Sequence, residues 1–193
     1  METPLWPEEE NWVCNAVASR RQEFAAGRAA ARTALARLGA PQAAIPVNPD
    51  RTPAWPHGFV GSITHCHGFC GAVVARERDV QGLGFDAEPA EPLPEGVGRI
   101  IYDEDEAAHF SALPAMNGLD WPKLAFSAKE AFYKCFFPLA RMPLNFRDVQ
   151  VRFTADGGFE IKSGKAASFL DGFVQGRWRM RDGLVFTSFW RQP

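Results

Sequence analysis

The sequence has few cysteines, little net charge and no long apolar run, and each shortage excludes a class of protein. Its four cysteines are scattered over 193 residues without the spacing of a disulfide framework, so we expect reduced thiols and a cytoplasmic protein. No apolar run approaches the roughly 20 residues that span a bilayer, and the acidic N-terminus lacks the apolar core of a secretory signal, so we expect no membrane contact. The net charge of −2 gives no indication of a nucleic-acid partner.

Hydrophobic side chains, in contrast, are abundant. They make up 46% of the chain, and sixteen Phe and six Trp predict an aromatic core. The length fits one large domain or two small fused halves. The charge is uneven, because nine Lys or Arg stand against five Asp or Glu from residue 141 to the end. This excess fits a basic face for an acidic partner, and it fits a solvated strand surface equally well.

One helix is predicted over about residues 121–137. Asp120 is a suitable N-cap, Pro122 lies in the first turn where a missing N–H costs nothing, and Pro138 is expected to end the helix. Apolar residues recur through it at helical spacing, which predicts a buried stripe.

Two charged residues on this helix indicate a functional site. Glu130 and Lys134 are four apart and therefore share one face, where a carboxylate and an ammonium group suit a site that holds a metal ion and a phosphate together. The alternative is a solvated ion pair of little energetic weight. Ser127 and Glu130 also match a helix capping box, although Asp120 already marks an earlier helix start.

An Ala- and Arg-rich stretch predicts a second helix over residues 19–38, ended by a glycine. Arg21, Arg28 and Arg32 are spaced seven and four apart and so follow one face of this helix. Guanidinium groups bind phosphate in a bidentate manner, so three of them in a row indicate a phosphate site. A solvated basic face is the commoner explanation of such a row.

Three strands follow a loop that is rich in proline, asparagine and glycine. We expect them over residues 59–65, 71–75 and 81–88, and the tight turns between them predict one antiparallel sheet.

Asp86 and Glu88 lie two apart at the end of the third predicted strand and therefore point to the same side. Carboxylates so close repel each other unless a cation or protons intervene. With Glu130 they would form a cluster of three, and oxygen ligands without cysteine favour Mg²⁺ or Mn²⁺ over zinc. The alternative is that Asp86 and Glu88 simply end an exposed strand.

The rest of the chain repeats a helix-then-sheet pattern. Residues 89–98 are rich in proline and glycine and form the best boundary between two halves, of about 1–92 and 93–193. A short helix is expected near 103–113, another near 164–170, and hairpin turns at 155–157 and 182–183. We therefore predict an α+β fold of two pseudo-symmetric halves, each a small, mainly antiparallel sheet packed with helices.

Five motifs in a fixed order resemble the 4′-phosphopantetheinyl transferases, specifically the larger type that serves siderophore and other peptide or polyketide synthetases. Three of them look like the enterobactin-associated branch: Phe-x-x-Gly-Arg-x-Ala-x-Arg-x-Ala-Leu at 24–35, Arg-x-Pro-x-Trp-Pro-x-Gly at 51–58 and Gly-Ser-Ile-Thr-His at 61–65. Two look like signatures of the whole superfamily: Gly-x-Asp-x-Glu at 84–88 and Phe-Ser-x-Lys-Glu-Ala-x-x-Lys at 126–134.

The resemblance implies a Mg²⁺-dependent reaction between two substrates. A serine of an apo acyl or peptidyl carrier protein attacks the β-phosphate of coenzyme A, which leaves the carrier with a phosphopantetheine arm and releases adenosine 3′,5′-bisphosphate. It also implies a single transferase unit, with the active site between the two halves and a monomer as the active species.

The resemblance assigns roles to individual residues. Asp86, Glu88 and Glu130 would bind the metal, with water in the place beside Ala87, whose side chain cannot ligate. Because the reaction needs a general base for the serine proton, we expect Glu130 to take it, directly or through a metal-bound water. Glu106 falls where relatives often carry a carboxylate near the metal.

The expected catalytic residues are Glu130, Lys134 and His65. Lys134 would contact the pyrophosphate of coenzyme A and His65 would donate to it, while Arg28 or Arg32 would meet the 3′-phosphate and Arg51 the adenosine end. The full set expected to bind coenzyme A is Arg28, Arg32, Arg51, Ser62, His65, Lys129 and Lys134.

Two other functions remain open from the sequence. His65, Cys66, His67 and Cys70 place four possible zinc ligands within six residues, although zinc sites normally use two separated pairs. The other alternative is a non-catalytic relative that binds coenzyme A or a carrier protein, since a fold can outlive its activity.

Overall fold

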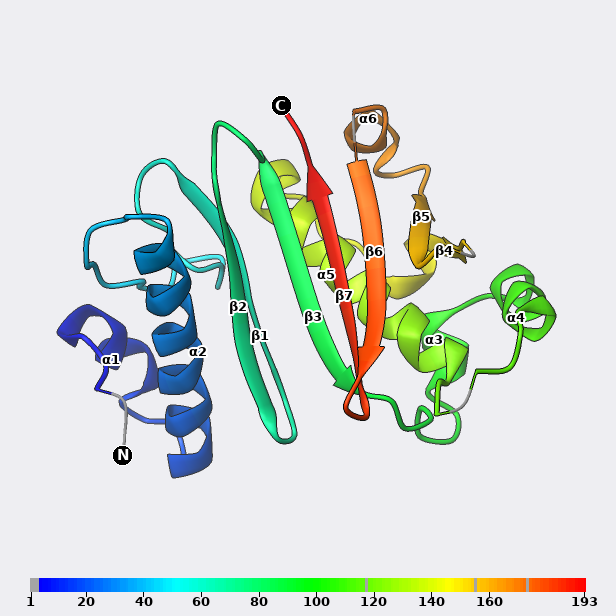
Figure 1. Cartoon of the computed structure of the whole chain (residues 1–193), viewed down its shortest axis with the longest axis horizontal. Coiled ribbons are helices and arrows are strands. Elements are labelled where there is room, and N and C mark those ends of the chain that lie inside the picture. The colour runs from blue at the N-terminus through cyan, green and yellow to red at the C-terminus, as the bar shows by residue number, and fades with distance from the viewer. Residues whose placement is uncertain (1–3, 117, 155, 173) are drawn as a thin grey trace.

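The computed structural model describes residues 4–116, 118–154, 156–172 and 174–193. Helices pack against two antiparallel sheets, which confirms the predicted α+β class (Figure 1). Within the described residues, no helix is both long and apolar enough to cross a membrane.

The N-terminal elements are two helices and a hairpin. Helix α1 (Pro7–Val13) precedes the long helix α2 (Ala18–Arg37), which lies beside strands β1 (Phe59–Cys66) and β2 (Phe69–Arg76). The two strands pair in an antiparallel register and join through Gly68, whose φ of 76° lies in the left-handed region that glycine tolerates. A small core joins α2 to the loop that follows it, because Ile45 is buried against Ala31 and Leu35.

The second sheet is larger and contains the third strand that we expected beside β1 and β2. Its order is β3 (Gly82–Pro89), β7 (Leu184–Arg191), β6 (Val174–Arg181), β5 (Gly158–Lys162) and β4 (Gln150–Phe153). The expectation that β3 completes the first sheet is therefore wrong. Strand β7 offers β3 an unbroken eight-residue ladder, from Gly82 opposite Arg191 to Pro89 opposite Leu184. A partner so distant in the sequence leaves no local signal.

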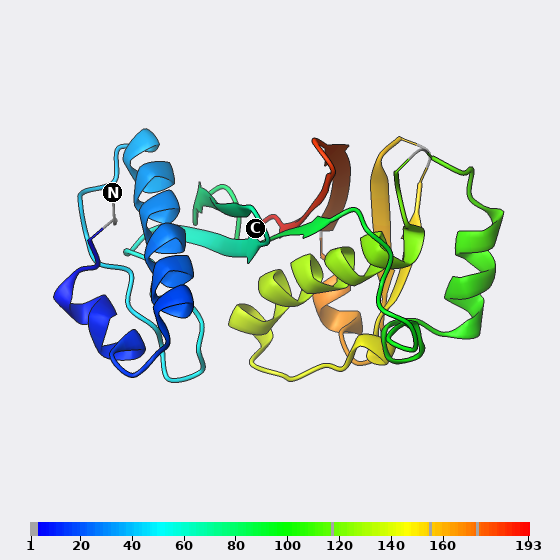
Figure 2. The same cartoon turned by 90° about the horizontal axis from the view of Figure 1, so that it is seen from below.

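Helix α5 (Trp121–Ala140) covers one face of the larger sheet (Figure 2). As predicted, Asp120 caps it by accepting a hydrogen bond from the backbone N–H of Lys123 at 2.9 Å. The helix does not end at Pro138 but continues to Ala140, and its C-cap residue Arg141 adopts a left-handed conformation with φ of 54°. Pro138 lies so near the end that it removes one helical hydrogen bond without breaking the helix.

Short elements complete the fold. They are α3 (Gly98–Ile101), α4 (Glu104–Ala112), a 3-10 turn η1 (Phe146–Asp148) and α6 (Ala167–Leu170). Strands β6 and β7 join through Asp182 and Gly183, both at positive φ, which confirms that predicted turn. Strands β4 and β5 also pair as predicted, although Ala155 of their turn lies outside the described residues.

Gly84 is predicted to be irreplaceable for packing. A Cβ at this position would lie 1.8 Å from the backbone oxygen of Ala131 on α5. Because backbone cannot move away as a side chain can, Gly84→Ala should lower the free energy of unfolding by about 3 kcal/mol in urea titrations. Gly164→Ala is the control, since an added Cβ there meets no atom within 4 Å. Equal stability of the two variants would contradict this packing.

Candidate active site

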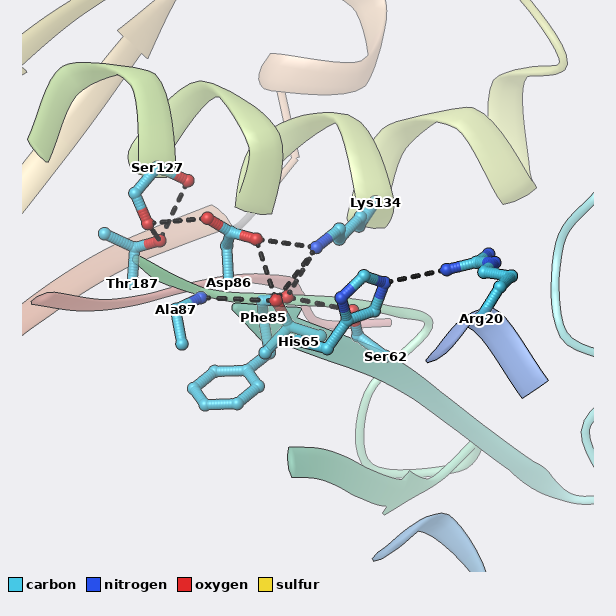
Figure 3. A network of polar contacts seen from close by, with 10 residues as sticks. Arg20, Ser62, His65, Phe85, Asp86, Ala87, Ser127, Lys134 and Thr187 are labelled. Carbon is cyan, nitrogen blue, oxygen red and sulfur yellow. Dashed lines mark hydrogen bonds and ion pairs between the residues drawn. The ribbon is translucent and has the colours of Figure 1, made fainter. Parts of the chain in front are cut away.

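The site is built around the buried carboxylate of Asp86 on β3. It accepts hydrogen bonds from Thr64 Oγ1 at 2.9 Å and Ser127 Oγ at 2.8 Å, and it forms an ion pair with Lys134 Nζ at 2.7 Å (Figure 3). Thr64 comes from β1, whereas Ser127 and Lys134 come from α5. Asp86 therefore joins both sheets and the long helix at one point.

Local geometry explains why these groups meet. Gly84 and Asp86 share one face of β3, and the missing side chain of Gly84 lets the backbone of α5 approach closely. The same approach brings Ser127 of α5 to Asp86. Ser127 precedes Lys134 by seven residues, which is two helical turns, so both side chains lie on the face of α5 that meets Asp86. Thr187 on β7 then fixes Ser127 by donating to its backbone oxygen at 2.9 Å.

Glu88 and Glu130, the other predicted metal ligands, lie within electrostatic reach of Asp86. Burial raises the pKa of the Glu130 carboxyl, and the charges of Asp86 and Glu88 raise it further, while Lys134 opposes them. Burial likewise raises the pKa of Glu88, followed by the charge of Asp86, and Lys123 lies 3.5 Å from its carboxylate. Negative charge is thus concentrated here, and nearby lysines offset it in part.

This set of donors fits a hard divalent cation by its chemistry. All three side chains offer carboxylate oxygen, the ligand type that Mg²⁺ and Mn²⁺ prefer, and their mutual repulsion is relieved by positive charge. As the side chains stand, no group of three or more His, Cys, Asp or Glu among the described residues is close enough together to hold a metal ion. In this arrangement Lys134 takes up the charge of Asp86 instead.

A cavity of about 780 Å³ lies next to this cluster, between the N-terminal elements and the end of α5. Lys134 connects the two features, because it lines the cavity while its ammonium group binds Asp86. The predicted ligand-binding residues that line the cavity are Arg28, Arg51, Ser62, His65 and Lys134. Arg20 and Arg141 line it as well, so cationic side chains are numerous around the cavity.

Arg28 is the most deeply buried of these cations. It is 6% exposed, stacks over the ring of Phe24 at 4.1 Å, and donates from Nε to the backbone oxygen of Ile45 at 2.6 Å. Burial lowers the pKa of Arg28 to about 10, so the guanidinium remains charged at neutral pH. A fixed, partly desolvated guanidinium in a cavity is well suited to bind an anion.

His65 lies at the exposed side of the cavity with Arg20 and Glu23. Arg20 donates to His65 Nε2 at 3.0 Å, and because arginine can only donate, the neutral ring carries its proton on Nδ1. The carboxylate of Glu23 lies 3.9 Å from that nitrogen. His65 therefore keeps one N–H that a ligand can use.

The chain matches two family models. Residues 8–75 match the family model described as the 4′-phosphopantetheinyl transferase N-terminal domain, and residues 82–188 match that of the 4′-phosphopantetheinyl transferase superfamily. The chain belongs to the 4′-phosphopantetheinyl transferase superfamily. The resemblance expected from the five motifs is confirmed.

Similar members of this superfamily align over nearly the whole chain. The 4′-phosphopantetheinyl transferase PptT of Mycobacterium tuberculosis is 42% identical over 96% of the chain and 85% of its own length. Svp of Streptomyces mobaraensis is 41% identical over 95% of the chain and 77% of its own. Enterobactin synthase component D of Salmonella typhimurium is 32% identical over 95% and 77%, respectively.

Three residues that family resemblance placed at the site lie elsewhere. Arg32 binds the buried carboxylate of Glu9 at 2.7 Å and does not line the cavity. Lys129 is 2% exposed, donates to Glu106 at 2.9 Å and lies away from the cavity lining. Glu106 accepts in addition from the backbone N–H groups of Asp103 and Val151. The ion pairs of Arg32 with Glu9 and of Lys129 with Glu106 therefore stabilise the fold away from the cavity.

Three residues at the site, Thr64, Ser127 and Arg20, are not among the site residues predicted from the sequence. Thr64 and Ser127, which hold Asp86, belong to two of the superfamily motifs and could have been found there. Arg20 precedes the predicted row of arginines by one residue, while Arg21 within that row donates to the backbone oxygen of Val13 at 3.2 Å.

The alternative zinc site finds no support in the described part of the chain. His65 and Cys70 face each other as cross-strand partners, yet no metal-binding group of His, Cys, Asp and Glu forms around them. Burial raises the pKa of the Cys66 and Cys70 thiols, which keeps them protonated and poor zinc ligands.

The ion pair of Lys129 and Glu106 is predicted to stabilise the folded protein and not to bind a ligand. Lys129→Met would leave Glu106 as an unpaired buried charge, so the free energy of unfolding should fall by about 3 kcal/mol in urea titrations. Adding Glu106→Gln should restore part of the loss, whereas Lys162→Met at an exposed lysine should change little. A folded, fully stable Lys129→Met protein with weakened coenzyme A binding would instead show that Lys129 contacts the ligand.

Proposed function

We propose that this chain transfers the 4′-phosphopantetheine arm of coenzyme A to a serine of an apo acyl or peptidyl carrier protein, with release of adenosine 3′,5′-bisphosphate. The observation that carries the proposal is Lys134, which lines a cation-rich cavity and at the same time binds Asp86, a buried carboxylate whose charge acts on Glu88 and Glu130. Membership of the transferase superfamily supports the same reaction.

The cavity provides groups for each charged part of coenzyme A. Arg28 would bind the 3′-phosphate with the two guanidinium nitrogens that Ile45 leaves free. Arg51, held in a turn at φ of 70°, would meet the adenosine end, and Ser62 lines the same cavity. His65 and Lys134 would meet the pyrophosphate through the Nδ1–H group and the ammonium group.

Asp86, Glu88 and Glu130 are the residues that would hold Mg²⁺ or Mn²⁺. The bound cation would neutralise charge that develops on the phosphate oxygens. The residues of the chain contribute in the same sense, because phosphoryl transfer depends mostly on positioning and on neutralising oxygen charge. Lys134 must then give up part of its pairing with Asp86 to reach the pyrophosphate.

Proton transfer is assigned to Glu130. The serine oxygen forms a bond to the β-phosphorus, the bond from that phosphorus to the leaving bisphosphate oxygen breaks, and Glu130 takes the serine proton. A positioned carboxylate is one of the side chains that serve as a general base in proton transfer.

The carrier and the pathway are proposed only by class. Enterobactin synthase component D is one of the similar proteins, so we place the chain in siderophore or other secondary metabolism. The basic excess after residue 141 would suit an acidic carrier surface. Both halves of one chain line the cavity, so a monomer is sufficient for the reaction.

A non-catalytic relative is the weaker alternative. Asp86, Glu88, Glu130 and Lys134 are all present and lie within electrostatic reach of one another, which supports a catalytic protein.

Mass spectrometry of an apo carrier protein tests the reaction directly. Incubation with this protein, coenzyme A and Mg²⁺ should add the mass of one phosphopantetheinyl arm, and EDTA should abolish the gain because the carboxylates then lack their cation. Absence of any gain on fatty-acid, polyketide and peptidyl carriers, from a protein that binds coenzyme A, would favour the non-catalytic alternative.

Glu130→Gln should abolish transfer while leaving the protein folded. Burial and two neighbouring carboxylates disfavour the charge of Glu130, so its removal should not lower the midpoint of thermal unfolding. Rates are measured by carrier mass shift, with Glu160→Gln at an exposed position as the control. A rate near that of the wild type would exclude Glu130 both as base and as metal ligand.

A further inference from the structure

Besides Asp86 and Glu106, the carboxylate of Glu9 on α1 is buried; it lies outside the cavity and is not used by the proposed reaction. It is 0% exposed, although Glu8 and Glu10 on either side of it are exposed. It accepts from Arg32 on α2 at 2.7 Å and 2.8 Å, from the backbone N–H of Ile45 at 2.8 Å, and from that of Trp6 at 3.0 Å. One carboxylate thus ties together α1, α2 and the loop that follows α2.

The loop contact leads directly to the cavity. The N–H of Ile45 donates to Glu9, and the carbonyl oxygen of the same residue accepts from Nε of Arg28 at 2.6 Å. Ile45 is itself 0% exposed, so its backbone has little freedom to adjust. Only one residue, Ile45, therefore connects Glu9 to the guanidinium of Arg28, which lines the cavity.

From this connection we infer that Glu9 is a positioning residue for the anion-binding guanidinium of Arg28. By fixing the Ile45 backbone, it holds in place the carbonyl oxygen that binds Nε of Arg28, while the other two guanidinium nitrogens make no bond to Ile45. The inference rests on the proposed function, in which Arg28 binds the 3′-phosphate of coenzyme A.

The charge of Glu9 supports the same role. Arg28 is buried, and its neighbours Arg32 and Arg20 repel it, whereas Glu9 is the charge that favours its cationic form. The pairing with Arg32 also explains why a second arginine stands close to Arg28 without entering the cavity. Loss of Glu9 would release both arginines and the Ile45 backbone together.

Binding of coenzyme A and 3′-dephospho coenzyme A to single variants tests the inference. Glu9→Gln should weaken the binding of coenzyme A by roughly tenfold, which is the effect of one impaired charge-assisted hydrogen bond. The loss should appear both in the Kd measured by calorimetry and in the KM. The affinity of this variant for 3′-dephospho coenzyme A and its kcat should stay near those of the wild type. Arg28→Ala should show the same selective loss, and adding Glu9→Gln to it should cause no further selective loss.

The controls separate positioning from general stability. Glu10→Gln, an exposed neighbour on the same helix, should leave both affinities unchanged. If Glu9→Gln does not fold, Glu9→Asp keeps the charge with a shorter reach and should give a smaller effect that is still selective for coenzyme A. Equal losses for both ligands, or selective losses that add in the double variant, would overturn the inference.

Failure of the proposed transfer reaction can be distinguished from failure of the positioning inference. If the wild type binds coenzyme A but transfers nothing to a carrier, the reaction is refuted while the binding comparison still decides the role of Glu9. If Arg28→Ala is selective and Glu9→Gln is not, the positioning inference alone is overturned. If neither variant loses more affinity for coenzyme A than for 3′-dephospho coenzyme A, Arg28 does not bind the 3′-phosphate, and the inference about Glu9 is refuted as well.

Discussion

The arrangement of the whole molecule depends on the buried carboxylate of Asp86. A charge removed from water must be paired and hydrogen-bonded, and Asp86 obtains its partners from two directions, Thr64 on β1 and both Ser127 and Lys134 on α5. These contacts hold the small hairpin, the larger sheet and the long helix in fixed relation. The cavity lies where the hairpin and the end of α5 diverge.

The junction of the two sheets uses side chains in place of a backbone ladder. Strand β3 pairs along one edge with β7. Towards β1 its backbone meets hydroxyl groups instead, since Ser62 donates to the oxygen of Phe85 and Thr64 accepts from the N–H of Ala87, both at 3.3 Å. The same hydroxyl of Thr64 binds Asp86, so one side chain both joins the sheets and shapes the site.

Two pairs of carboxylates in this chain have opposite consequences. Glu9 and Glu106 are each saturated by an arginine or lysine and by backbone N–H groups, and they fix the fold. Glu88 and Glu130 have raised pKa values because burial and neighbouring carboxylates disfavour their charge. Under-neutralised groups of this kind lower stability and are characteristic of functional sites, where a ligand supplies the missing charge. This contrast distinguishes the carboxylates that stabilise the fold, Glu9 and Glu106, from those at the candidate site, Glu88 and Glu130.

The sequence by itself determined what short-range spacing controls. The cap at Asp120, the turn at Asp182, the shared side of Asp86 and Glu88 and the shared face of Glu130 and Lys134 all follow from helical or strand periodicity. Only the tertiary structure decided which chemically equal residues reach the cavity. Arg28 and Arg32 share a helix face, yet Arg32 pairs with Glu9, and Lys129 beside Glu130 pairs with Glu106. Likewise β3 pairs with β7 and not with β2. These choices depend on partners far away in the sequence, because burial forces each charge and each strand edge to be satisfied by whatever group the fold brings next to it.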